Sequence, residues 1–417
     1  MPIKNLASLA AASACALLLG CSTPCDAPGG LCAPVDTNTR LIPAAPPPAL
    51  RPIPPPPEAI VTTSPIDGPD MPDEAPAAAP AVITDTTRIA LLLPLNSATL
   101  AAAADAVRAG FMAAYERDRA GFVIDLVPSG DTVDTTIQAY RDAAARNDMV
   151  VGPLLRPAVA AVAAGTAGAV VKPTLALNHP GDGTPLPPNM LTIGLSIEDE
   201  ARQVAAWAHA DYPAGRPLVL TGTAAWQRRL AGAFHDRWNA FGNSAYQFEL
   251  NGVDGRIDDA SLLSLKTRME IDAPDFLFAA LDAEQLRQVR AALGTSLPAY
   301  GTASVNPGLG AGASIAELDG VRMLDLPWQV QADHPAAMAY PRRAQQSRAA
   351  PDMDRLYALG IDAYRVAREM ALHPGQPVAL DGVTGQLRIQ PQAPRFQRSE
   401  APVIYRGGLF EAVAGER

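Results

Sequence analysis

Short hydrophobic runs alternate with longer amphipathic stretches from Arg88 almost to the end of the chain. Ile89–Leu93 is entirely apolar, which is typical of a strand buried on both faces of a parallel sheet. The stretch that follows places Leu100, Val107 and Phe111 at the spacing of one helix face. The pattern therefore predicts a fold in which strands and helices alternate.

The same alternation continues along the chain. Further strands are predicted at residues 122–127, 149–152, 173–177, 191–194, 217–221, 245–250, 275–279 and 321–324. Helices are predicted at 135–146, 157–165, 198–211, 225–241, 261–269, 284–293 and 354–372, before a hairpin-like end at 378–389 and 403–405. Repeated strand–helix units indicate parallel sheets flanked by helices on both faces. About 330 residues exceed the comfortable size of one core, so we predict two α/β lobes.

The first twenty residues carry a pattern typical of a secretory signal. Lys4 supplies a positive charge, and Leu6–Leu19 forms an apolar run too short to span a bilayer stably. The run closes on Leu18-Leu19-Gly20-Cys21, which resembles the lipobox of bacterial lipoproteins. Residues 1–20 are therefore predicted to be removed and Cys21 to carry the lipid. An ordinary cleaved signal that contains a cysteine is the alternative.

Residues 21–84 are predicted to form a lipidated, disordered tether. Pro46–Pro48 and Pro54–Pro57 lie among Ala, Thr and Asp, and the apolar residues there show no period. Proline runs favour extended polyproline II, so about fifty residues could reach on the order of 100 Å. A spacer is the favoured interpretation, and a polyproline ligand for a partner is the alternative. The folded domain is then expected at residues 85–417.

All four cysteines lie near the start of the chain. Cys15 would leave with the signal, and an oxidising compartment favours a disulfide between Cys25 and Cys32. Two free thiols in the tether are the alternative. Ser22 stands where an aspartate would resemble the inner-membrane retention signal, so we expect anchoring in the outer membrane, facing the periplasm.

Composition and motifs argue against several functions. The net charge of −10 leaves nucleic-acid binding without an electrostatic basis. No nucleophile-elbow, zinc-protease, phosphate-loop or Ser-x-x-Lys motif occurs. Glu198–Glu200 are predicted to lie in the first turn of a helix that Ser196 caps, where the helix dipole favours carboxylates. Gly308–Gly312 is predicted to be a flexible connection. The five histidines show no metal-ligand spacing and are expected on the surface or in loops. We therefore predict no catalysis, no cofactor and no metal.

Five segments of the predicted domain resemble one known family. They are Arg88–Asn96 (RIALLLPLN), Val150–Pro157 (VVGPLLRP), Pro173–Pro180 (PTLALNHP), Leu356–Tyr364 (LYALGIDAY) and Leu380–Ile389 (LDGVTGQLRI). In this order, after a lipobox, they are similar to the C-terminal domain of LpoA-type penicillin-binding protein activators. That domain resembles type I periplasmic binding proteins of the branched-chain amino-acid kind.

The resemblance implies a two-lobed fold and a non-catalytic outer-membrane lipoprotein. Such a protein binds a class A penicillin-binding protein and stimulates peptidoglycan synthesis. Enterobacterial family members carry a helical-repeat domain before this one, whereas here only the proline-rich tether precedes it and no helical repeat is found. The contact residues of the family do not map onto this chain, so none is carried over.

Polar residues at strand ends are the candidates for a cleft. Gly152-Pro153 would end a strand at the carboxyl edge, where open α/β sheets bind ligands, and Asn96 and Asn178 end the strands beside it. Arg156 could attract an anionic ligand or be a solvated charge at a helix start.

The second predicted lobe offers Trp226, which could stack on a ligand or pack in the core. Amino-acid binders of this fold hold the ligand carboxylate with hydroxyl side chains and backbone N–H groups. Leu154–Pro157 has no hydroxyl, and Pro157 has no N–H group. We therefore expect a protein partner. A lipid-anchored binding protein for an amino acid or another small anion is the alternative, and a purely structural scaffold is a third possibility.

Overall fold

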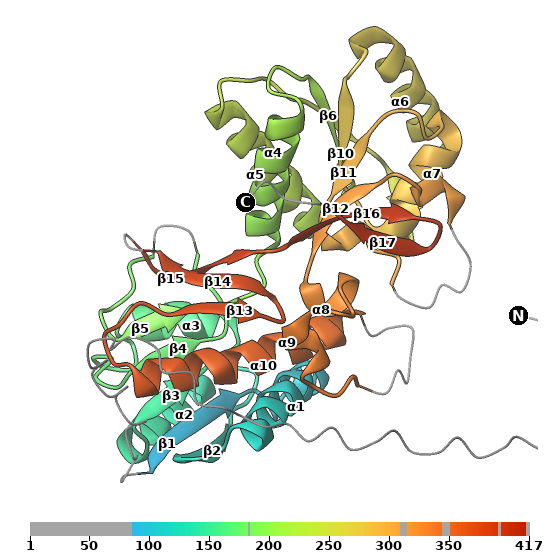
Figure 1. Ribbon diagram of the computed structural model, residues 1–417. Helices are drawn as coiled ribbons and strands as arrows, with labels where there is room; N and C mark the ends of the chain where they lie inside the picture. The colour runs from blue at the N-terminus through green and yellow to red at the C-terminus, as the bar shows by residue number, and fades with distance from the viewer. Residues whose placement is uncertain (1–85, 182–183, 309–314, 344–350, 391–392, 414–417) are drawn as a thin grey trace, which may run out of the picture. The chain divides into compact units, whose positions relative to one another are not determined.

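Two sheets, each flanked by helices on both faces, form the two lobes of the computed structural model (Figure 1). The structure describes residues 86–181, 184–308, 315–343, 351–390 and 393–413, all within one compact unit of residues 78–417. The predicted signal, tether, lipidation of Cys21 and pairing of Cys25 with Cys32 lie outside the described residues. Among the described helices, none has the length and hydropathy needed to cross a bilayer.

The first lobe contains an eight-stranded sheet with the order β13-β14-β15-β5-β4-β3-β1-β2. Its strands are β1 Thr87–Leu93, β2 Phe122–Pro128, β3 Met149–Val151, β4 Thr174–Ala176, β5 Met190–Thr192, β13 Ala379–Gly382, β14 Gly385–Gln390 and β15 Ala393–Ser399. Strands β1 to β5 are parallel, but β13, β14 and β15 pair with one another antiparallel. Strands β13 and β14 form the hairpin predicted at residues 378–389, and short connections join β13, β14 and β15 without helical crossovers.

Helices flank both faces of this sheet, as predicted. Helices α1 and α10 pack on the face of Ile89 and Leu91, and α2 and α3 pack on the face of Ala90 and Leu92. This alternation of buried residues is the reason that β1 is apolar throughout. The helices of this lobe are α1 Ala101–Arg117, α2 Val133–Arg146, α3 Arg156–Ala163, α8 Pro327–Val330, α9 Pro335–Met338 and α10 Pro351–Leu372.

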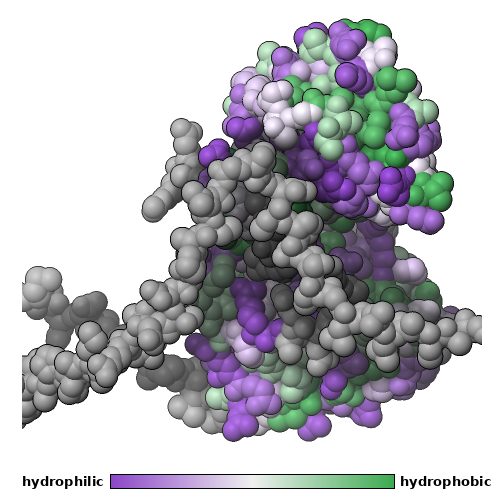
Figure 2. All heavy atoms as spheres, turned by 90° about the vertical axis from the view of Figure 1, so that its right-hand side faces the viewer, coloured by the Kyte–Doolittle hydropathy of each residue, from purple (hydrophilic) through white to green (hydrophobic). Residues whose placement is uncertain are grey.

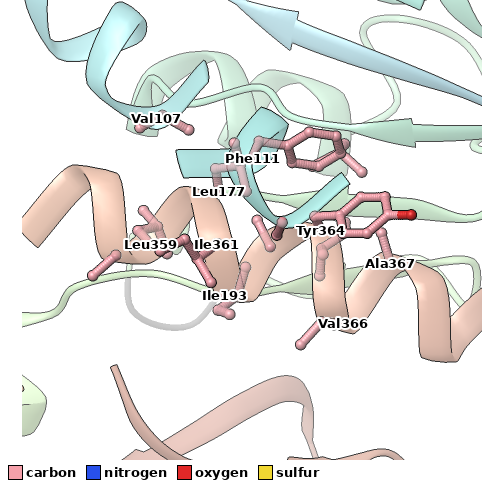
Figure 3. Packing of buried hydrophobic residues seen from close by; sticks show 14 of the residues in the cluster. Val107, Phe111, Leu177, Ile193, Leu359, Ile361, Tyr364, Val366 and Ala367 are labelled. Carbon is pink, nitrogen blue, oxygen red and sulfur yellow. The ribbon is translucent and has the colours of Figure 1, made fainter. Parts of the chain in front are cut away.

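Two glycines let α1 and α10 approach closely. A Cβ atom on Gly110 would lie 1.9 Å from a carbonyl oxygen of α10, and one on Gly360 would lie 2.1 Å from the carbonyl oxygen of Val107. Phe111 and Tyr364 pack edge to face beside this contact, with ring centroids 5.2 Å apart (Figure 3). Helix packing therefore accounts for the glycine within the LYALGIDAY segment.

The buried carboxylate of Asp362 ties α10 to the turn between β13 and β14. It accepts hydrogen bonds from the N–H groups of Val383 (3.1 Å) and Thr384 (2.8 Å) and from the Thr384 hydroxyl (2.7 Å). A Cβ atom on Gly382 would lie 2.4 Å from Asp362 Oδ2. The LYALGIDAY and LDGVTGQLRI segments therefore meet in one structural cluster.

The second lobe contains a seven-stranded sheet with the order β17-β16-β12-β11-β10-β6-β7. Its strands are β6 Pro217–Thr221, β7 Tyr246–Glu249, β10 Phe276–Ala280, β11 Ala299–Gly301, β12 Arg322–Asp325, β16 Ala401–Arg406 and β17 Leu409–Ala412. Strand β16 runs antiparallel to both β12 and β17, so this sheet is also mixed. Strands β11 and β17 were not predicted; β17 is largely exposed and so lacks a buried apolar run.

Helices α4 and α5 pack on one face of the second sheet, and α6 and α7 pack on the other. Their bounds are α4 Ile197–Asp211, α5 Ala225–Ala240, α6 Asp259–Asp272 and α7 Ala283–Leu293. A separate hairpin, β8 Gly252–Val253 and β9 Arg256–Ile257, and two 3-10 turns, Ala303–Val305 and Ala316–Leu318, complete the lobe.

Candidate functional site

A cavity of about 280 Å³, which we call the arginine pocket, lies at the carboxyl ends of β4 and β5, beside the starts of α3 and α4 and beside β15. It is lined by Arg156, His179, Pro180, Gly181, Thr184, Pro185, Leu186, Thr192, Ser196, Glu198, Arg202, Pro394 and Arg395. Carboxyl ends of parallel strands are the usual place for ligands in open α/β sheets. The arginine pocket is therefore the first candidate for a functional site.

Arg156 is the sequence-predicted residue that lines this pocket. The chain reaches it through Gly152, whose φ of 119° favours glycine and whose added Cβ would lie 2.2 Å from the carbonyl oxygen of Leu92. Arg156 Nε donates to the carbonyl oxygen of His179 at 3.1 Å, and its Nη1 lies 3.9 Å from Glu198 Oε1. One side of the guanidinium thus fixes the wall of the pocket, while 41% of the side chain stays exposed.

The other sequence-predicted residues at the strand ends do not line the arginine pocket. Asn178 Nδ2 donates to the carbonyl oxygen of Leu154 at 3.1 Å, and its Oδ1 accepts the N–H of His179 at 2.9 Å, so it fixes the turn behind the pocket. Asn96 is exposed, and its N–H donates to the carbonyl oxygen of Ser129 at 3.1 Å. Asn96, Asn178, Gly152 and Pro153 are not among the lining residues.

His179 is a pocket residue that sequence reasoning missed. It follows β4 in a loop, as expected for the histidines, but its side chain is buried, and Nδ1 lies 2.8 Å from Thr192 Oγ1. Burial, reinforced by nearby arginines and opposed by Asp199, lowers its pKa to about 4. His179 is therefore neutral at pH 7. Its position directly after Asn178, at the end of a predicted strand, is the signal that could have identified it.

The first turn of α4 brings two carboxylates to the pocket. Ser196 Oγ caps the helix by accepting the N–H of Asp199 at 3.1 Å, which confirms the predicted cap. Burial acts to raise the pKa of Asp199, but the hydrogen bond and charge of Arg202 outweigh it and hold this pKa below its usual range. Arg395 Nη2 lies 3.6 Å from Asp199 Oδ1.

Guanidinium groups outnumber carboxylates in and around the pocket. Glu198 Oε1 also accepts from Arg229 Nε at 3.1 Å, and Arg156 lies near the same oxygen. Four arginines therefore surround two carboxylates: Arg156, Arg202, Arg229 and Arg395 surround Glu198 and Asp199. With His179 neutral, the local charge is positive, although the whole chain carries −10.

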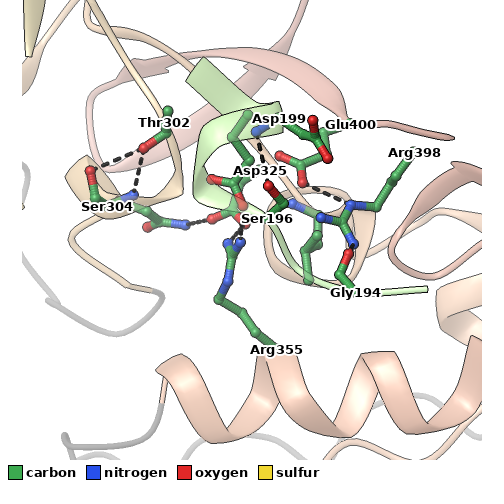
Figure 4. Close-up of polar contacts among 12 residues, drawn as sticks. Gly194, Ser196, Asp199, Thr302, Ser304, Asp325, Arg355, Arg398 and Glu400 are labelled. Atoms are coloured by element: carbon green, nitrogen blue, oxygen red, sulfur yellow. Dashed lines mark hydrogen bonds and ion pairs between the residues drawn. The ribbon is translucent and has the colours of Figure 1, made fainter. Parts of the chain in front are cut away.

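The segments that cross between the lobes lie beside this pocket and are joined by a buried ionic network (Figure 4). Arg355 of α10 forms an ion pair with Asp325 at the end of β12 and donates to Glu200 of α4 at 2.6 Å. Asp325 also accepts from Asn306 Nδ2 at 2.6 Å. The buried carboxylate of Glu200 belongs to the acidic run that the sequence analysis assigned to a helix start.

The chain crosses between the lobes after β5, after β12 and after β15. The crossing between β15 and β16 joins the same network. Arg398 donates to the carbonyl oxygen of Gly194 and to Glu400 Oε1 (3.0 Å), and the N–H of Glu400 donates to Gln203 at 3.1 Å. Burial, together with the charge of Glu200, raises the pKa of Glu400 to about 8. We call Glu200, Asp325, Arg355, Arg398 and Glu400 the crossover network.

Trp226 lies at a second cavity, of about 240 Å³, at the ends of β6, β7 and β10. We call this cavity the amide pocket because Gln227, Asn251 and Gln285 line it, together with Asp254 and Asp282. Gln227 Nε2 donates to Gln285 Oε1 at 2.6 Å. Trp226 also packs partly against the core of α4 and α5. The two pockets share no lining residue.

Exposed hydrophobic side chains do not mark one contact surface. Leu263 and Ile271 on α6 are 68% and 71% exposed, and Leu409 on β17 is 70% exposed. On the face in Figure 2, hydrophobic and hydrophilic residues are interspersed. Scattered exposure of this kind is ordinary for protein surfaces. The described residues also contain no group of histidine and carboxylate side chains that could hold a metal ion.

Comparisons with known proteins agree with this architecture. A solved structure from Chromobacterium violaceum ATCC 12472, described as "a putative branched-chain amino acid ABC transporter", is 34% identical and has a TM-score of 0.64. The match covers 76% of this chain and 100% of that one. The LpoA (YraM) C-domain from Haemophilus influenzae, described as a regulator of PBP1A, is 21% identical with a TM-score of 0.62 over 79% of this chain and 100% of that domain.

Full-length LpoA from Haemophilus influenzae is 22% identical with a TM-score of 0.62, and the match covers 79% of this chain but only 59% of LpoA. No curated protein matches the chain. The family model described as "LppC putative lipoprotein" matches residues 72–401, which is well over half of the chain. The chain thus belongs to the LppC lipoprotein family, and its folded part is a periplasmic-binding-protein-like domain of the LpoA type.

Proposed function

We propose that this protein is an outer-membrane lipoprotein that binds and activates a class A penicillin-binding protein, and so stimulates peptidoglycan synthesis. The observation that carries the proposal is the match of the LppC family model over residues 72–401. The LpoA C-domain, described as a regulator of PBP1A, has the same fold. Lipidation at Cys21 would fix one end of the chain to the membrane, and residues 21–84 would let the domain reach across the periplasm.

The loop after β3 supports a protein partner over an amino acid. Leu154–Pro157 supplies no hydroxyl group, and Pro157 has no backbone N–H group. A free amino acid would therefore lack the usual donors for its carboxylate in this loop. The favoured function needs no catalytic group of the chain, because the synthase supplies the chemistry.

A lipid-anchored solute-binding protein is the second candidate. The Chromobacterium violaceum structure at 34% identity, described as a transporter for branched-chain amino acids, favours it. The arginine pocket favours it as well, because a cavity with convergent polar groups is the usual form of a small-molecule site.

A reconstituted assay separates the two functions. The full mature chain and its unlipidated Cys21→Ser form would each be added to purified class A synthases of the same organism, with lipid II as substrate. We expect a faster rate of glycan polymerisation or crosslinking with both forms, and crosslinking to the same synthase in cells. Unchanged rates with every class A synthase, together with tight calorimetric binding of an amino acid, would contradict activation as the function and support solute binding.

The anchor itself is tested by fractionation. Cys21→Ser should move the protein from the outer-membrane fraction to the soluble periplasmic fraction. A variant that remains in the membrane fraction would contradict lipidation at Cys21, whatever the partner.

A further inference from the structure

We propose that the arginine pocket binds a small anion through a carboxylate or phosphate group. The site would act in addition to any surface that contacts a synthase, so it does not depend on the proposed function. Its occupant would be held by Arg156, Arg202 and Arg395, which come from α3, α4 and β15.

Unused hydrogen-bonding capacity is the first argument. A guanidinium carries five N–H donors, arranged to hold a carboxylate or phosphate with two parallel bonds. The side chain of Arg395 makes no hydrogen bond to another described residue, and its nearest carboxylate oxygen lies 3.6 Å away. Arg156 donates through Nε to the carbonyl oxygen of His179, and its Nη1 is 3.9 Å from Glu198 Oε1. The N–H groups of its terminal nitrogens therefore remain available to a ligand.

Uncompensated charge is the second argument. Four arginines surround two carboxylates, and His179 contributes no charge at pH 7 because its pKa is low. Two positive charges are therefore left for a ligand to neutralise. The first turn of α4, a helix of fifteen residues, adds the partial positive charge of a helix start.

The walls of the cavity limit the size of the ligand. Pro180, Pro185, Leu186 and Pro394 give the pocket an apolar side, against which the uncharged part of a ligand can pack. The cavity volume of about 280 Å³ lies just below the range of roughly 300–1,000 Å³ that is common for ligand sites. This space fits one small molecule.

The position of the pocket gives its occupancy a structural consequence. Asp199, which Arg202 and Arg395 share, directly precedes Glu200 of the crossover network. Arg395 lies three residues before Arg398, which holds the crossing between β15 and β16. A bound anion would draw Arg395 away from Asp199. It would so act on two segments that join the lobes, the one between β5 and α4 and the one between β15 and β16.

Calorimetry on the unlipidated full chain tests the site, with inorganic phosphate and succinate as separate probes. Ionic strength is held constant with chloride, because screening alone would otherwise change the result. We expect saturable binding of at least one probe. Binding of phosphate alone would indicate a phosphorylated ligand, binding of succinate alone a carboxylate ligand, and binding of both a general oxyanion site.

Two variants and a matched control make the test specific. Arg395→Gln and Arg156→Gln should each weaken binding about tenfold or more, which corresponds to about 1.4 kcal/mol. Arg108→Gln removes the same charge from the exposed face of α1 and should leave the affinity unchanged. Binding of neither probe, or equal affinities in all three variants, would overturn the proposal. Synthase activation is measured on the same variants, so failure of this site is distinguishable from failure of the proposed function.

Discussion

Two groups of arginines lie close together in the fold but differ in their surroundings. In the crossover network, the side chains of Arg355 and Arg398 are 13% and 5% exposed and are hydrogen-bonded to carboxylates. In the arginine pocket, Arg156 and Arg395 are 41% and 34% exposed and lie 3.6–3.9 Å from the nearest carboxylate oxygens. The buried guanidinium groups are held by short hydrogen bonds to acidic side chains, whereas the half-exposed groups of Arg156 and Arg395 keep N–H donors for water or a ligand.

The largest expected effect on stability comes from removing a buried arginine of the crossover network. Arg355→Met leaves Glu200 and Asp325 in the interior without their cation, which should lower the free energy of unfolding by roughly 3–5 kcal/mol. Arg395→Met is the control from the pocket and should cost less than about 1 kcal/mol, because its ion pair is half-exposed. Urea denaturation measures both. Equal losses in the two variants would show that burial does not separate the two groups.

A second effect should appear in the pH dependence of the crossover network. The pKa of Glu400 is about 8 in the folded chain, so the folded state keeps a proton that the unfolded state releases above about pH 4.3. The stabilising contribution is complete below that pH and is lost as the pH rises through 8. The loss is at most about 1.4 kcal/mol per pH unit.

Glu400→Gln isolates this contribution. Urea denaturation at pH 5, 6, 7 and 8 gives the stability of the wild type minus that of the variant at each pH. We expect this difference to fall steadily across the series, because glutamine does not titrate. A difference that stays constant or rises would contradict the raised pKa of Glu400.

The smallest effect on stability is expected from His179 in the arginine pocket. Its contribution is lost as the pH falls, whereas that of Glu400 is lost as the pH rises. The pKa of His179 is about 4, below the value of about 6.5 for an unfolded histidine, so folding favours the neutral ring. Its contribution is complete above pH 6.5 and is lost as the pH falls through 4. The shift is smaller than that of Glu400, and so is the expected change in stability. NMR titration of the His179 ring should give a midpoint near 4, and a midpoint near 6.5 would place the ring in solvent.

Much of the fold could be predicted from the sequence because its strands are buried on both faces. The apolar run Ile89–Leu93 and the helix spacing through Phe111 depend only on local periodicity. Strand β15 escaped prediction because charged and polar residues occupy most of its length, and Arg398 within it is buried through ion pairing. No local pattern distinguishes such a strand from a loop.

The arginine pocket could be predicted only in part, because its residues are distant in sequence. Arg156 was identified from its place after a strand end. Arg202 joins it from α4, and Arg395 joins it through the pairing of β15 with β5, where Arg395 is the register partner of Thr192. That pairing spans about two hundred residues and has no signature in either segment.

The C-terminal segment has a consequence for how the chain folds. Strands β13 to β15 complete the first sheet, and β16 and β17 complete the second, so residues 379–412 contribute to both lobes. Until this segment arrives, β5 and β12 present unpaired edges. Contacts between such distant segments slow folding. They also lengthen the time during which these unpaired strand edges can pair with other chains and aggregate. A chain that emerges N-terminus first therefore cannot finish either lobe before residues 379–412 arrive, and it should depend on chaperones until then.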